Sequence, residues 1–176
     1  MKIVLTGFMG TGKTVVGRRL AERLALPFVD LDDAIEEAAS MAIPEIFASE
    51  GESGFRRRER ELIASMANRG SCVVATGGGA VLDPENVRNL RTGAFLVCLV
   101  ASPGVILQRL GTDGRRPLLQ SPDRLARIRD LLEQRGPAYA QADLSIETSG
   151  ADVEEIVDRI VQHLRLQTAA SVDTGR

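Results

Sequence analysis

The chain is poor in aromatic residues and cysteine, and each scarcity excludes a class of protein. Aromatics make up 3% of the 176 residues, with one Tyr and no Trp, so a site that stacks on nucleobases is disfavoured. The two cysteines, Cys72 and Cys98, lie inside apolar runs, which predicts buried reduced thiols. Together with a single His they offer no metal-ligand spacing.

Charge and hydropathy exclude further classes. A net charge of −2 argues against a chain that coats nucleic acid, which would be basic. No run approaches the roughly 18 consecutive apolar residues of a membrane span, and the opening "MKIVLTGFMG" becomes glycine-rich before a signal peptide could form. We therefore expect a cytoplasmic protein with no nucleic-acid or membrane partner. The lack of a sustained apolar seam predicts a monomer.

Short apolar runs alternate with segments of helical periodicity. The runs that predict strands are "KIVLTG", "PFVD", "CVVATGGG", "AFLVCLV" and "DLSIET". This alternation predicts one α/β domain, in which a five-stranded parallel sheet has helices on both faces. Pro44 and "SEGESG" interrupt a helical stretch. The last helix is expected at Val153 to Leu166, with a disordered tail at 167–176.

The segment "GFMGTGKT", from Gly7 to Thr14, matches the phosphate-binding loop G-x-x-x-x-G-K-[ST]. A strand precedes it and a helix follows it, as that loop requires. Lys13 would reach the β- and γ-phosphates of a nucleotide, and the Thr14 hydroxyl would ligate Mg²⁺. Backbone N–H groups would bind phosphate oxygens along the loop and the first helical turn, at Gly10, Thr11, Gly12, Lys13, Thr14 and Val15.

Three acids follow the second strand in "FVDLDD". Because side chains alternate along a strand, Asp30 and Asp32 are expected on one side and Leu31 on the other. At this edge of the sheet one carboxylate can hold Mg²⁺ through water, and the other can accept a proton from an attacking hydroxyl. Asp33 stands three residues before Glu36, a spacing typical of a helix start.

Glycines and arginines indicate an anionic acceptor beside the nucleotide. "TGGG" ends the third strand, and Gly77, Gly78 and Gly79 would open backbone N–H groups to a ligand. One inward-facing arginine of Arg56, Arg57 and Arg58 would suffice to bind a carboxylate bidentately.

Three further arginines have open roles. Arg116 lies in the turn-rich "GTDGRRPLL", a candidate mobile loop that would close over the transferred phosphate. Arg135 stands near a predicted helix C-terminus, where a favourable dipole contact alone would explain it. Arg109 would stack on a base or coat the surface.

The motifs together resemble shikimate kinase from Met1 to about Leu166. They occur in that family's order and spacing as "GFMGTGKT", "DLDDAIEE", "IFASEGESGFRRRE", "ATGGGAV", "RRPLL" and "EQRGPAY". The resemblance implies a three-layer P-loop kinase fold over 1–166. It further implies transfer of the ATP γ-phosphate to the 3-hydroxyl of shikimate, with Mg²⁺ as cofactor, on the pathway to chorismate and aromatic amino acids.

The resemblance also implies residue roles. A substrate-binding segment would cover about 31–60 and a lid about 111–123. The implied roles are Asp30 near Mg²⁺, Asp32 as base on the substrate hydroxyls, Arg56 and Arg135 on the substrate carboxylate, Glu59 orienting Arg56, Gly77 to Gly79 lining the ring, Arg116 on the phosphates and Arg109 near adenine. Because the lid carries paired arginines, Arg115 remains an alternative to Arg116.

Three rival functions are compatible with a phosphate-binding loop. A gluconate or nucleoside monophosphate kinase has a similar build, but a nucleotide acceptor would call for stacking aromatics. A GTPase would predict an N-K-x-D segment, which the sequence lacks. A nonenzymatic nucleotide sensor would tolerate loss of the acceptor residues, and all of them are present.

Overall fold

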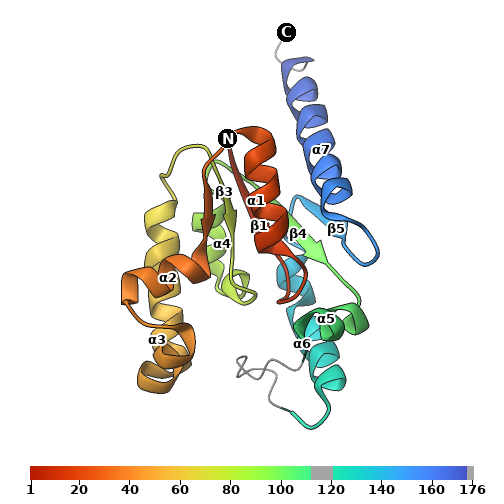
Figure 1. The fold of residues 1–176 in the computed structure, drawn as a ribbon. Helices are drawn as coiled ribbons and strands as arrows, with labels where there is room; N and C mark the ends of the chain where they lie inside the picture. The colour runs from red at the N-terminus through yellow and green to blue at the C-terminus, as the bar shows by residue number, and fades with distance from the viewer. Residues whose placement is uncertain (112–120, 174–176) are drawn as a thin grey trace.

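A computed structural model describes residues 1–111 and 121–173. Its five strands form one sheet in the order β2-β3-β1-β4-β5, and every neighbouring pair is parallel (Figure 1). The five strands predicted from the apolar runs are therefore confirmed. They are β1 (Lys2–Thr6), β2 (Phe28–Asp30), β3 (Cys72–Ala75), β4 (Ala94–Val100) and β5 (Leu144–Glu147).

Helices cover both faces of this sheet. In the described ranges they are α1 (Lys13–Leu24), α2 (Leu31–Ala39), α3 (Ile43–Met66), α4 (Pro84–Arg91), α5 (Pro103–Leu110), α6 (Arg124–Tyr139) and α7 (Val153–Asp173), with a 3₁₀ turn η1 (Ala80–Leu82). On β1, Ile3 and Leu5 pack with α1 and α7, whereas Val4 packs with α3 to α6. Alternate side chains of the strand therefore enter two separate cores, one on each face of the sheet. The predicted three-layer α/β fold is confirmed.

Both predicted interruptions between β2 and β3 are present. Pro44 lies in the first turn of α3, where its missing N–H removes no helical bond. Gly51 breaks the regular geometry of α3 with φ 70° and ψ −176°. A small third core around Ile35, Ile46 and Phe55 joins α2 to the kinked α3. This packing places the side chains of α3 over the end of β2.

The last helix is longer than predicted. It continues past Leu166 to Asp173, so residues 167–173 are helical and the expected disordered tail is wrong there. Alanine is the strongest helix former, and no Gly or Pro occurs between Leu166 and Asp173 to end the helix. Figure 1 shows this part of α7 extending beyond the sheet.

The carboxyl ends of three adjacent strands meet at one edge. Asp30 is in register with Ala75, and Ala75 is in register with Leu5. The glycine loop after β1, the acids after β2 and the "TGGG" segment after β3 therefore converge. Most of the predicted lid falls on 112–120, outside the described residues. Across 1–111 and 121–173, no helix has the length and apolar character needed to cross a membrane.

Candidate active site

The loop between β1 and α1 has the backbone of a phosphate-binding loop. Gly7, Gly10 and Gly12 have φ values of 129°, 79° and 96°, which L side chains rarely adopt. A Cβ on Gly7 would also lie 2.2 Å from the carbonyl oxygen of Leu99. Only glycine at this position lets the loop pass so close to β4.

The Lys13 side chain folds back onto the carbonyl groups of this loop. Its Nζ donates 2.9 Å hydrogen bonds to the carbonyls of both Gly7 and Phe8, and the residue is 9% exposed. Thr11 adds a 2.8 Å side-chain bond to the Phe8 carbonyl. Val15 is 59% exposed, so its side chain packs little. The predicted residues of the loop are thus brought together.

Asp30 links the loop to the acidic segment. The Thr14 hydroxyl donates a 2.7 Å bond to Asp30 Oδ2, while Asp30 Oδ1 accepts from the backbone N–H of Asp32 at 3.0 Å. Asp30 is therefore the N-cap of α2. Oxygen atoms of Thr14 and Asp30 stand together where the phosphates of a nucleotide would reach a cation.

Asp32 and Asp33 both lie in the first turn of α2, beyond the end of the strand. Strand β2 ends at Asp30 and α2 begins at Leu31, so strand alternation does not apply to Asp32. Asp32 nevertheless lines the same cleft as Asp30, because the first turn of α2 turns it back while Leu31 is fully buried. Asp33 is in the first turn of α2 as expected, but it is not the cap; it is 68% exposed and pairs with Arg18 at 3.5 Å.

A cleft of about 610 Å³ joins these groups to the predicted acceptor residues. Met9, Phe47 and Phe55 contribute apolar wall. The cleft is further lined by the predicted site residues Thr14, Asp30, Asp32, Arg56, Glu59, Gly77, Gly78, Gly79 and Arg135. Residues more than 100 positions apart in the sequence therefore share one cavity.

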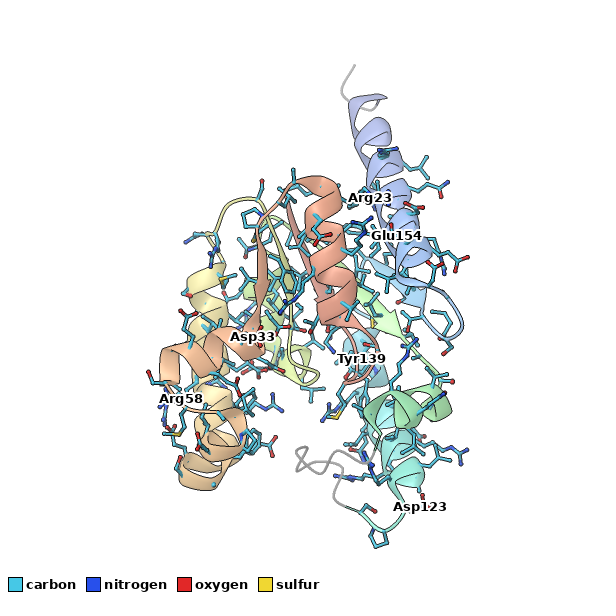
Figure 2. All side chains as sticks on the ribbon, in the orientation of Figure 1. Arg23, Asp33, Arg58, Asp123, Tyr139 and Glu154 are labelled. Carbon is cyan, nitrogen blue, oxygen red and sulfur yellow. The ribbon has the colours of Figure 1, made fainter. Side chains whose placement is uncertain are left out.

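The structure decides between the three arginines of "FRRRE". Arg56 faces the cleft and donates to Glu59 Oε2 at 2.7 Å. Arg57 and Arg58 instead pair with Glu50, at 3.1 Å and 2.6 Å. Figure 2 shows Arg58 on α3, well away from Tyr139. Glu50 therefore binds two of the three guanidinium groups across the kink at Gly51, and only the third, that of Arg56, faces the cleft.

Glu59 is the most deeply buried acid of the site. Its side chain is 1% exposed. Burial raises the pKa of its carboxyl above the usual 4.5, and the Arg56 guanidinium opposes that rise. A Cβ on Gly77 would lie 3.0 Å from both Glu59 Oε1 and Asp32 Oδ1. Gly77 thus fits between two carboxylates.

Arg135 lies across the glycines from Arg56. It is 6% exposed, its Nη1 donates to the carbonyl of Gly78 at 3.2 Å, and its guanidinium lies 5.5 Å from the ring centre of Phe8. A Cβ on Gly79 would lie 2.5 Å from Arg56 Nη2. A dipole contact at a helix end therefore does not account for Arg135, which is buried against the loop.

Arg109 occupies the opposite side of the loop. Its guanidinium donates to Thr148, at 3.0 Å to the hydroxyl and 2.7 Å to the carbonyl, and to the Gly10 carbonyl at 3.4 Å. Thr148 is 1% exposed and was not predicted. It follows β5, so it could have been found as a hydroxyl at the same sheet edge. Arg115 and Arg116 lie outside the described residues.

Tyr139 is the second residue that the prediction missed. Its hydroxyl donates a 2.7 Å bond to the carbonyl of Gly78. Burial raises the pKa of this hydroxyl above its usual 10, which keeps it protonated as a donor. Its position four residues after Arg135 places both on one face of α6, and that spacing was the available signal.

A phosphate-binding loop, an acid pair at the next strand end and a cleft flanked by two arginines define a P-loop kinase of a small anionic acceptor. Comparison with known proteins makes this specific. The shikimate kinase family model matches residues 9–165, and the chain belongs to that family.

Named relatives agree over nearly the whole chain. The chain is 48% identical to a shikimate kinase of Symbiobacterium thermophilum, covering 94% of this chain and 97% of the relative. It is 46% identical to one of Thermodesulfovibrio yellowstonii, covering 91% and 92%. Among solved structures, shikimate kinase from Acinetobacter baumannii in complex with shikimate matches with a TM-score of 0.90 at 40% identity, covering 94% and 93%.

Proposed function

We propose that this chain transfers the γ-phosphate of ATP to the 3-hydroxyl of shikimate, giving shikimate 3-phosphate and ADP. One observation carries the proposal. A single cleft has Thr14 and Asp30 at its nucleotide end, Arg56 and Arg135 around its glycines, and Asp32 adjoining both groups. That arrangement suits a carboxylated polyol held beside a triphosphate.

The nucleotide end supports phosphoryl transfer. The N–H groups of the loop and Lys13 would bind the phosphates, and positive charge there stabilises the transferring group. Mg²⁺ prefers oxygen ligands and keeps several waters, so one or two protein oxygens suffice. Thr14 and Asp30 fit that requirement, and the described residues hold no cluster of three His, Cys, Asp or Glu that would cage an ion. When bound, Mg²⁺ would neutralise phosphate charge.

The acceptor end supports binding and activation of shikimate. Arg56 and Arg135 would bind its carboxylate, and Gly77 to Gly79 would line its ring. Asp32 would accept the proton of the attacking hydroxyl. We further propose Arg116, with Arg115 as the alternative, on the phosphates and Arg109 near adenine. Membership of the family supports a place in chorismate and aromatic amino acid biosynthesis; the cytoplasm and the monomeric state remain predictions.

An ADP-release assay tests the proposal. Purified chain with MgATP should release ADP rapidly with shikimate and at background rate with gluconate, CMP or AMP. A Lys13→Ala variant should abolish the shikimate-dependent rate, which shows that the chain itself is responsible. Lack of stimulation by shikimate would overturn the assignment, and stimulation by gluconate alone would support the rival kinase.

A further inference from the structure

The carbonyl of Gly78 is held by two side chains of α6. Tyr139 Oη donates to it at 2.7 Å, and Arg135 Nη1 donates at 3.2 Å. Both donors are buried, with 9% and 6% of their surface exposed. Because the two residues are four positions apart on α6, they reach the carbonyl from the same face of the helix.

The other side of Gly78 contacts the phosphate-binding loop. A Cβ on Gly78 would lie 3.2 Å from the backbone nitrogen of Met9 and 3.6 Å from the Gly7 carbonyl oxygen. Gly78 is therefore packed between this loop and α6. The contacts with the loop and the two hydrogen bonds to α6 together restrict rotation of the peptide group between Gly78 and Gly79.

The orientation of this carbonyl determines the orientation of the next N–H. The described peptide bonds include no cis bond, and in a trans peptide the C=O and the following N–H point in opposite directions. With the Gly78 carbonyl directed at α6, the Gly79 N–H is directed away from α6, toward the side of the cleft lined by α3 and Arg56. Among described residues, none of the N–H groups of Gly77 to Gly79 donates a backbone–backbone hydrogen bond.

We propose that Tyr139 is a positioning residue for the acceptor substrate. Its hydroxyl orients the peptide between Gly78 and Gly79 so that the Gly79 N–H faces shikimate, and it shares the Gly78 carbonyl with Arg135. Without the hydroxyl, Arg135 alone restrains that carbonyl, and the same guanidinium must also bind the substrate carboxylate. The inference rests on the proposed function, since it names the substrate of the same site.

Tyr139→Phe tests the role, because it keeps the ring and removes only the hydroxyl. We expect the KM for shikimate to rise about tenfold, on the scale of one lost hydrogen bond, while the KM for ATP stays within twofold. Ile128→Val is the matched control, since Ile128 is fully buried in the same helix and does not line the cleft. It should lower the melting temperature without raising either KM.

A spectroscopic signature separates positioning from a purely structural role. Tyr139 is the only Tyr and the chain has no Trp, so emission excited at 280 nm reports this residue alone. Shikimate should change the wild-type emission with a midpoint equal to the calorimetric Kd.

Two outcomes overturn the inference alone: an active wild type with an unchanged KM for shikimate in Tyr139→Phe, or an emission that saturating shikimate leaves unchanged. A wild type that does not phosphorylate shikimate overturns the proposed function, and the positioning role with it.

Discussion

Arg56 Nη1 donates a 2.7 Å hydrogen bond to Oε2 of Glu59, one turn further along α3. The Glu59 side chain is 1% exposed and the Arg56 side chain 26%, so the acid lies buried beneath the arginine, and the arginine faces the cleft. Such a pair restrains the arginine more than it stabilises the fold, because burial of the carboxylate opposes the gain from the contact.

Glu59→Gln should separate these two effects. The raised pKa means that the folded chain binds the Glu59 proton more tightly than the unfolded chain. The stability contributed by this group is therefore present below pH 4.5 and is lost as the pH rises through the folded pKa. Glutamine, which resembles the protonated acid, should keep or raise the melting temperature while the KM for shikimate rises about tenfold.

Glu52→Gln is the control for that variant, because Glu52 contacts Arg56 at 3.4 Å from an exposed position. It should leave the melting temperature and the KM for shikimate nearly unchanged. The acidic limb of kcat/KM for shikimate should shift in Glu59→Gln, because the variant removes a group whose pKa burial raises. A fall in melting temperature with an unaltered KM would contradict a positioning role for Glu59.

Asp32→Asn should lower kcat by about 10² or more, on the scale of lost general-base catalysis, with ATP affinity nearly intact. Single-turnover ADP formation measures the rate of the chemical step, and calorimetry measures the affinity for ATP. Asp33→Asn is the matched control, since Asp33 is 68% exposed and pairs with Arg18. If Asp33→Asn produced the loss instead, the assignment of the base would be wrong.

Gly79→Ala should displace Arg56. The new Cβ would lie 2.5 Å from Arg56 Nη2, too close for any real contact, so the guanidinium must move. We expect the KM for shikimate to rise about tenfold or more, as when a bidentate carboxylate contact is lost. Gly104→Ala on α5, where the added Cβ meets nothing within 4 Å, should leave the KM unchanged. Equal kinetics for the two variants would show that Arg56 does not bind the acceptor.

Thr148→Val should weaken ATP binding selectively. The substitution removes the hydroxyl that accepts from Arg109, while Arg109 also reaches the Gly10 carbonyl. Loss of a hydrogen bond to a charged group predicts an increase of about tenfold in the KM for ATP, with that for shikimate within twofold. Ser65→Ala, which removes an exposed hydroxyl on α3, is the control. An unchanged KM for ATP would argue against a role for this contact.

Local sequence patterns predicted much of the fold and the nucleotide end of the site. The apolar run "AFLVCLV" indicated β4, and "GFMGTGKT" indicated the loop between β1 and α1. Both signals arise from neighbouring residues, since periodicity and glycine conformations are properties of a short segment. The same locality explains the errors. The boundary of β2 at Asp30 depends on the side chain of Asp30 capping α2, which alternation does not reveal.

By itself, the sequence determined an α/β chain with a phosphate-binding loop and a set of acids, glycines and arginines. The tertiary structure decided which of them act together. It directed Arg56 into the cleft and Arg58 to Glu50, buried Arg135 against Phe8, and brought Tyr139 to Gly78, 61 positions earlier. Apart from the Arg58–Glu50 pair within α3, these contacts join segments far apart in the chain, and no short stretch of sequence shows which distant segment a side chain will meet.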